Sequence, residues 1–413
     1  MDNFYVYIDK IQLLFIFINS FLLSRVLVVT KVPERLVLYL IGKQHLPISR
    51  ISLYVIAASA LLSFFIPNVI TVLALLPILK ILCDTFEESL PLRYREIETL
   101  LPLALIYGAN IGGMGSITGT PANGIMVVYA TLYNLPGVEY LTFENWLLWG
   151  VPIVCAFVIM SWLLLTLYFR LWTYDNDLVR VIVHETDACH PLQKIAVKIT
   201  LLFFLLSILL SILIKTSGQQ IFILGLTGSS SLVLILLLFI IPIRSPLDHI
   251  PRRMLHMKDC YSNLPWRGIL VLGVIVLLLG IGALLNIQKY ILLLFQAVFQ
   301  QDYSPVMLYL VVAALTAFST ELFSNTVVQI AMFIVMRPLC EASSLVALQT
   351  FLIITLSCTS AFMTPIATGV NGLAFGEMKG ISFSRMMIVG LLMKISSILM
   401  LAFGVPWLFS LAL

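Results

Sequence analysis

Apolar runs long enough to cross a lipid bilayer follow one another along this 413-residue chain. A transmembrane helix needs about 20 consecutive apolar residues, and residues 11–29, 146–169, 196–214, 221–243, 268–285 and 386–409 form such runs. Residues 288–300 are amphipathic and are predicted to lie along the membrane interface. The composition is 61% hydrophobic and only 11% charged, whereas a soluble domain is roughly 25% charged. A soluble globular chain and a disordered chain are therefore excluded. We predict an all-α polytopic integral membrane protein with about eight spans, placed in the cell (inner) membrane.

Basic residues are unevenly distributed among the segments that join these runs. Lys and Arg recur in residues 31–50, 170–198 and 244–267, whereas residues 133–145 contain two glutamates and no Lys or Arg. Cytoplasmic loops are enriched in Lys and Arg. The three basic segments are therefore predicted to face the cytoplasm, and the C-terminus is predicted to face outside.

Two further apolar runs are interrupted near their middle by residues that a helix centre tolerates poorly. Residues 51–82 are interrupted at Ile66-Pro67-Asn68, and residues 306–335 around Ser324-Asn325-Thr326. Each run is longer than one span and has polar or proline residues at its centre. We predict that each forms a re-entrant hairpin, in which two short helices meet at a tip.

Another pair of runs is predicted to form helices that break near the bilayer centre. Residues 100–135 contain glycines at 112, 113, 115 and 119 before Pro121, and residues 347–375 contain Thr364-Pro365 and Gly369-Val370-Asn371. Irregular backbone survives at membrane depth only where it is buried in protein or lines a wet cavity. The alternative is that these residues are packing positions or kinks, which membrane helices commonly carry.

The order of a hairpin followed by a broken helix occurs twice, which favours an inverted repeat. Paired interrupted segments in corresponding halves are typical of secondary transporters. This divides the chain into an N-terminal scaffold span with an amphipathic segment (1–50), a first transport repeat (51–170), scaffold spans with an interfacial helix (171–305) and a second transport repeat (306–413).

The tips and breaks are rich in Ser, Thr and Asn. Broken helices expose main-chain groups that have lost their partners, with N–H groups that attract anions and carbonyls that attract cations. Neutral oxygen ligands suit a hard cation and do not suit a soft metal. The pattern indicates a site for a small cation beside an anion.

Three motifs in these segments resemble a known family. Thr320-Glu321 with Phe323-Ser324-Asn325-Thr326 resembles the second hairpin signature of the divalent anion:sodium symporters, which carry dicarboxylates, citrate or sulfate. Residues 111–123 resemble the first broken helix of that family, and residues 360–371, followed by Phe375-Gly376, resemble the second. The resemblance runs from about Ile11 to the C-terminus.

The resemblance implies two sodium sites and no organic cofactor. The first would use Ser63, Asn68 and the backbone at Gly119, and the second Thr320, Asn325 and the carbonyl of Ala367. The substrate would lie between the tips, held by Asn68, Ser324, Asn325 and Thr326, with Thr120 and Thr368 nearby. It also implies an elevator motion against a dimeric scaffold, and hence a homodimer in the lipid bilayer.

Two features depart from the family pattern. The first tip reads Pro67-Asn68-Val69, where the family commonly has Ser-Asn-Thr, so two hydroxyls are missing. Each lost hydrogen bond to a charged ligand costs roughly 1.5–3 kcal/mol. In addition, one span precedes the first hairpin where the family usually has about four, so we expect about three N-terminal spans to be lacking.

Two charged residues fall within predicted membrane segments. A carboxylate at membrane depth, here Glu321, is a functional candidate by default, and it is also a candidate structural partner at the hairpin tip. Lys394, in the last run, is interpreted as snorkelling toward the cytoplasmic face, with a role in transport as its alternative. The loop from His184 to His190 is interpreted as a polar cytoplasmic loop, with metal binding as its alternative.

The predicted function is secondary active transport of a small divalent anion (a C4-dicarboxylate, citrate or sulfate), coupled to sodium by an elevator-type mechanism. Alternatives are a sodium-independent or proton-coupled exchanger and a transport-incompetent sensor or scaffold. A membrane-embedded enzyme is disfavoured because every histidine lies in a predicted loop. No motif for nucleotide or nucleic-acid binding is present.

Overall fold

A computed structural model describes residues 2–41, 46–89, 93–174, 191–217, 219–242, 253–261, 304–337, 344–378 and 380–412. Its regular structure over these residues is helical. Six helices among them are long and apolar enough to cross a membrane, and shorter apolar helices accompany them. The chain is therefore a polytopic membrane protein, as predicted. The predicted span 268–285, the interfacial segment 288–300 and the histidine-containing loop 184–190 lie outside the described residues.

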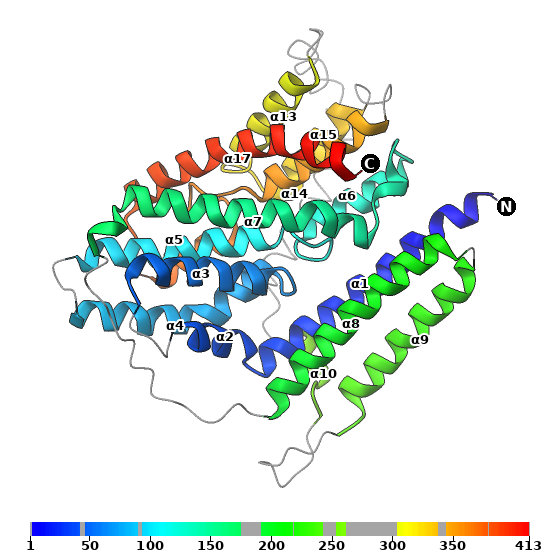
Figure 1. Cartoon of the computed structure of the whole chain (residues 1–413), viewed down its shortest axis with the longest axis horizontal. Coiled ribbons are helices and arrows are strands. Elements are labelled where there is room, and N and C mark those ends of the chain that lie inside the picture. Colours follow the sequence, from blue (N-terminus) through cyan, green and yellow to red (C-terminus); the bar gives the residue numbers. More distant parts are fainter. Residues whose placement is uncertain are drawn as a thin grey trace.

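Three long helices form a layer that is set apart from the rest of the molecule (Figure 1). They are α1 (Asp2–Val29), α8 (Pro191–Thr216) and α9 (Gln220–Phe239), and the short helix α10 (Met257–Tyr261) contacts α1. Gln12 Nε2 donates to Thr227 Oγ1 at 3.3 Å, and Asn19 Nδ2 donates to Ser231 Oγ at 2.6 Å. These bonds join α1 to α9 where hydrophobic burial supplies little attraction between helices. We call α1, α8 and α9 the scaffold layer.

The first interrupted region folds as two helices that meet at a short turn. Helix α2 (Val32–Ile41) leads to α3 (Ile48–Ser63), and α4 (Asn68–Ser89) begins directly after Pro67. Both α3 and α4 pack on α5 (Tyr94–Gly112). A break at 113–120 separates α5 from α6 (Pro121–Leu132). The interruptions therefore lie where the sequence predicts them.

The chain then continues into α7. A short 3-10 turn, η1 (Val138–Tyr140), precedes α7 (Phe143–Tyr168), and η2 (Leu171–Tyr174) follows it. Thr142 caps α7 by accepting a hydrogen bond from the Asn145 N–H. Trp146 at the start of α7 donates through Nε1 to the carbonyl of Met114 at 3.0 Å. Helix α7 thus supports the irregular backbone of the first break.

The second interrupted region repeats this order. Helix α13 (Pro305–Ser319) and α14 (Asn325–Met336) meet at residues 320–324, and both pack on α15 (Ser344–Thr359). A break at 360–368 separates α15 from α16 (Gly369–Glu377), and α17 (Phe383–Ala412) ends the described chain.

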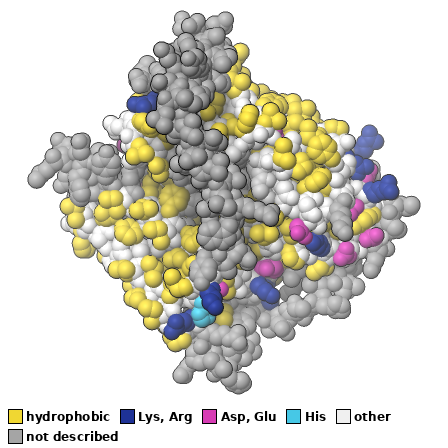
Figure 2. All heavy atoms as spheres, turned by 180° about the vertical axis from the view of Figure 1, so that it is seen from behind, with side chains coloured by type: hydrophobic (Ala, Val, Ile, Leu, Met, Phe, Trp, Pro, Cys, Tyr) yellow, Lys and Arg dark blue, Asp and Glu magenta, His cyan; other side chains and the backbone are white. Residues whose placement is uncertain are grey.

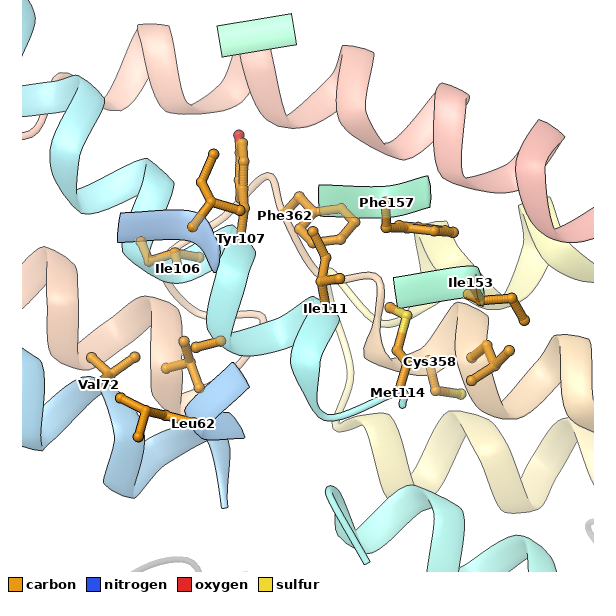
Figure 3. Packing of buried hydrophobic residues seen from close by; sticks show 14 of the residues in the cluster. Leu62, Val72, Ile106, Tyr107, Ile111, Met114, Ile153, Phe157, Cys358 and Phe362 are labelled. Carbon is orange, nitrogen blue, oxygen red and sulfur yellow. The ribbon is translucent and has the colours of Figure 1, made fainter. Parts of the chain in front are cut away.

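Each hairpin forms one unit together with the broken helix that follows it. The second half of each broken helix packs on the other unit. Helix α16 contacts α4 and α5 of the first unit, whereas α6 contacts α14 and α15 of the second. Between the units, the rings of Tyr107 and Phe362 meet edge to face with centroids 5.2 Å apart, and Figure 3 shows Ile111 and Met114 beside them. The two broken helices are therefore packed against each other in the interior.

The described surface is largely apolar. Leucines on the outer faces of α8 and α9 are widely exposed, Leu202 by 70% and Leu232 by 63%. Figure 2 shows hydrophobic side chains spread over one face, with most charged side chains toward one edge. Such a surface is stable in lipid and unstable in water, so the protein is an integral membrane protein.

Candidate functional site

The first tip is tied to α5 and to the break that follows this helix. Ser63, which is fully buried, donates through Oγ to the carbonyl of Ala109 at 2.7 Å and to Asn68 Oδ1 at 3.2 Å. Ser116 Oγ donates to the carbonyl of Phe64 at 2.7 Å. The polar groups of the tip are thereby fixed against the first broken helix.

Asn68 lies directly over the backbone at Gly113. A Cβ atom at position 113 would lie 2.6 Å from Asn68 Oδ1 and would also collide with the methyl group of Thr120. Glycine is therefore required there for steric reasons, because the tip and Thr120 both approach the same point of the main chain. The predicted residues Ser63, Asn68 and Thr120 are brought together at this point.

In both breaks, an asparagine side chain holds the irregular main chain through the same arrangement of hydrogen bonds. Asn123 Nδ2 donates to the carbonyls of Gly113 at 2.9 Å and Ser116 at 2.8 Å. Asn371 Nδ2 donates to the carbonyls of Ala361 at 3.1 Å and Thr364 at 2.8 Å. In each case the two acceptors lie 10 and 7 residues before the asparagine. Corresponding positions of the two halves therefore perform the same local task.

A threonine precedes the second half of each broken helix, but the two threonines are used differently. Thr368 Oγ1 accepts from the Asn371 N–H at 3.2 Å and donates to Asn371 Oδ1 at 3.0 Å. Thr120 has nearly the same backbone angles but makes no capping bond. Within the described part of the chain, Thr120 Oγ1 and Asn123 Oδ1 are buried without a hydrogen-bond partner.

Asn110 joins the two breaks to each other. Its Nδ2 donates to the carbonyl of Ala361 at 3.1 Å and to Asn371 Oδ1 at 3.2 Å. Asn110 lies on α5 and is 1% exposed, whereas Ala361 lies in the second break and Asn371 on α16 directly after it. Asn110 is not among the predicted site residues, although an asparagine inside an apolar run is a visible signal in the sequence.

The polar residues of the second tip are only partly hydrogen-bonded within the described structure. Thr320 is buried and donates to the carbonyl of Ala317 at 2.8 Å. Ser324 is exposed and makes no capping bond to α14, and Asn325 Oδ1 is buried without a partner in the described residues. Thr326 follows on the first turn of α14. Donors and acceptors of this tip thus remain open for a ligand.

Glu321 holds the second break. Its Oε1 accepts from the N–H groups of Phe362 and Met363, both at 3.1 Å. Its Oε2 accepts from the N–H of Thr364 at 2.9 Å and from Oγ1 of the same residue at 2.8 Å. A buried carboxylate is stable only when it is paired and hydrogen-bonded. Of the two interpretations of Glu321, the structural one is confirmed.

The interpretation of Lys394 as a snorkelling residue is wrong. Its side chain is fully buried, and Nζ lies 2.5 Å from Glu321 Oε1. Nζ also donates to the carbonyl of Ala317, which accepts the Thr320 hydroxyl as well. The ammonium turns inward because a carboxylate and a free carbonyl at the end of α13 offer it partners that lipid does not.

The starts of four helices face one another in pairs. At the start of α16, a Cβ on Gly369 would lie 3.4 Å from Cγ2 of Val69 at the start of α4. Gln329, on the first turns of α14, donates through Nε2 to the carbonyl of Ala122 at the start of α6 at 2.8 Å. Helix N-termini carry partial positive charge, so this arrangement favours an anion between them.

A polytopic helical protein with two half-helix pairs meeting at polar tips belongs to the transporter class. The model of the sodium:sulfate symporter transmembrane region family matches residues 6–413. The chain belongs to this family, and it is a membrane transporter, not an enzyme.

Two curated proteins that are similar to this chain are also named as transporters. The sodium-dependent dicarboxylate transporter SdcS of Staphylococcus saprophyticus is 26% identical over 417 residues, which cover 96% of this chain and 76% of that protein. SdcS of Staphylococcus aureus strain MRSA252 is 24% identical over 422 residues, covering 97% of this chain and 77% of that protein.

Proposed function

We propose that this protein is a secondary active transporter that moves a small divalent anion, with a C4-dicarboxylate as first candidate, together with sodium ions. The observation that carries the proposal is that the starts of α4 and α16, and those of α6 and α14, lie close together beside the two polar tips. Relatives named as sodium-dependent dicarboxylate transporters support the choice of substrate and ion.

The anion is proposed to lie between the two tips. Asn68, Ser324, Asn325, Thr326 and Thr368 supply amide and hydroxyl groups there, and the four helix starts supply main-chain N–H groups. Neutral donors and helix ends stabilise an anion without a fixed positive charge. Affinity for the anion then depends on the bound cations. In a symporter, this dependence couples transport of the anion to transport of the cation.

Two sodium sites are proposed beside the anion. The first involves Ser63, Asn68 and the backbone at Gly119, and the second Thr320, Asn325 and the carbonyl of Ala367. All of these offer oxygen atoms, which hard cations prefer. The buried, unpartnered Asn325 Oδ1 fits this role, because it lacks the donor that it needs in the described structure.

The corresponding hydrogen bonds of the two breaks support an inverted repeat of residues 51–170 and 306–413. We propose that these repeats form the moving unit of an elevator and that the scaffold layer belongs to a fixed, dimeric part. The separation of α1, α8 and α9 from the other helices supports this division (Figure 1).

Uptake of labelled succinate into proteoliposomes tests the proposal, with and without an inward sodium gradient and against empty vesicles. We expect uptake that needs sodium and that falls to the level of empty vesicles in Asn68→Ala and Asn325→Ala. Replacing Cys155, an exposed residue on α7, by serine serves as the control variant.

The proposal fails in two distinguishable ways. Uptake without sodium, driven by internal dicarboxylate, indicates an exchanger. Full uptake by Asn325→Ala contradicts the site while leaving the function standing.

A further inference from the structure

The first break contains an unmet hydrogen-bonding requirement that the second break does not. Thr120 is 5% exposed and Asn123 is fully buried, yet Thr120 Oγ1 and Asn123 Oδ1 have no partner within the described residues. At the second break Thr368 and Asn371 bond to each other, and Asn110 donates to Asn371 as well. A buried polar atom without a partner is destabilising, so a ligand that bonds to it is favoured.

The chemistry of the two atoms restricts the ligand. The amide nitrogen of Asn123 already donates to two carbonyls, so only its oxygen is free, and that oxygen is an acceptor only. An anion would be repelled by it. A hydroxyl oxygen and an amide oxygen together suit a hard cation.

Thr120 also lies beside the first tip, which has fewer hydroxyl groups than the second. The second tip has hydroxyls on both sides of its asparagine, at Ser324 and Thr326, whereas the first has Pro67 and Val69. Thr120 and Asn68 approach the same point above Gly113. The side chain of Thr120 is therefore adjacent to the tip that lacks hydroxyls.

We propose that Thr120 Oγ1 and Asn123 Oδ1 are ligands of the first cation, completing an oxygen shell with Ser63 and Asn68. This rests on the proposed sodium coupling and deepens it. Thr120, which the family resemblance places beside the substrate, then serves the ion. The first cation site then takes more of its oxygen ligands from the first break, and fewer from the first tip, than the family resemblance implies.

The test measures sodium binding by the purified full-length protein without substrate. Sodium replaces choline at constant ionic strength, and the thermal midpoint is followed against sodium concentration. Thr120→Val removes the hydroxyl at nearly constant shape, and Thr120→Ser retains it. Thr131→Val is the matched control on the same helix, because the Thr131 hydroxyl already donates to the carbonyl of Val127 at 2.7 Å.

We expect Thr120→Val to raise the half-saturating sodium concentration about 10-fold or more. Thr120→Ser and Thr131→Val should stay close to the unmodified protein, and succinate affinity in saturating sodium should be preserved in all three. If Thr120→Val melts early in choline, Thr120→Ala replaces it, since it relieves any crowding.

Two results overturn the inference while sodium coupling stands. One is an unchanged sodium curve in Thr120→Val. The other is a loss of succinate affinity in saturating sodium without a change in the sodium curve, which makes Thr120 a substrate ligand. A protein that shows no sodium response at all overturns the proposed coupling itself, and this inference with it.

Discussion

At the scale of single residues, Glu321 and Lys394 form a buried ion pair within the described structure. The two side chains are 6% and 0% exposed. Removing one partner of a buried pair leaves an uncompensated charge and costs about 3–5 kcal/mol. Since Lys394 shares the Ala317 carbonyl with Thr320, the leftover charge stands beside the proposed second cation site.

Single neutralisations of this pair should separate a positioning role from a purely structural one. Glu321→Gln leaves a bare ammonium and should weaken sodium binding, because like charges repel. Lys394→Gln leaves a bare carboxylate and should preserve or strengthen it. Both should lower the melting temperature. Thermal melts in sodium and in choline measure both quantities, and the double variant serves as the control.

In that double variant no net charge remains, so its sodium curve should lie between those of the two single variants. A shift of sodium affinity in the same direction in both single variants would show that the pair acts only through stability.

The residues of the site were predictable in part. Asn68 and Asn325 interrupt apolar runs, so their positions are visible in the chain itself. Lys394 was misinterpreted because its partner is fixed by the packing of α17 on α13, which hydropathy does not encode. The contrast between Thr120 and Thr368 depends on side-chain rotation, which residue types do not determine.

At the scale of elements, the breaks were the most predictable feature. Helix α5 ends at Gly112 and α6 begins at Pro121, while α16 begins at Gly369. Proline suits the first position of a helix because its missing N–H has no partner there in any case. Proline alone was not decisive, since α4 continues through Pro77 and α5 through Pro102. Glycine and asparagine beside the proline made the difference.

Replacing Gly113 by alanine should abolish transport with little effect on the rest of the fold. The added Cβ meets Asn68 Oδ1 at 2.6 Å, so the tip must shift away from the break. Gly225→Ala on α9 is the matched control, because a Cβ there meets nothing within 4 Å. Succinate uptake and the melting temperature are measured for both variants. Normal uptake by Gly113→Ala would contradict the close approach of tip and break.

At the scale of the whole molecule, the scaffold layer meets the first tip through aromatic rings. Phe204 on α8 lies with its ring centroid 5.0 Å from that of Phe65, 5.9 Å from that of Phe64 and 5.2 Å from that of Phe143. These contacts between aromatic rings are less directional than the hydrogen bonds that hold the first tip against the first broken helix. A small cavity beside them, lined in part by Thr118, shows that this interface is incompletely filled.

If the repeats move as an elevator past the scaffold layer, this aromatic contact must break in every cycle. Cysteines at positions 65 and 204, in a background without other cysteines, should therefore allow uptake until a mercury ion or a short bifunctional maleimide joins them. The joined protein should still bind succinate in the presence of sodium, since the site itself is untouched. Release of mercury by excess thiol should restore uptake.

Cysteines at positions 19 and 231 provide the comparison, because Asn19 and Ser231 are hydrogen-bonded within the scaffold layer at 2.6 Å. Joining them links two elements that the proposal keeps together, so uptake should continue. Continued uptake by the protein joined at 65 and 204 would mean that the first tip and α8 travel together. The fixed part would then have to be sought among elements other than α1, α8 and α9.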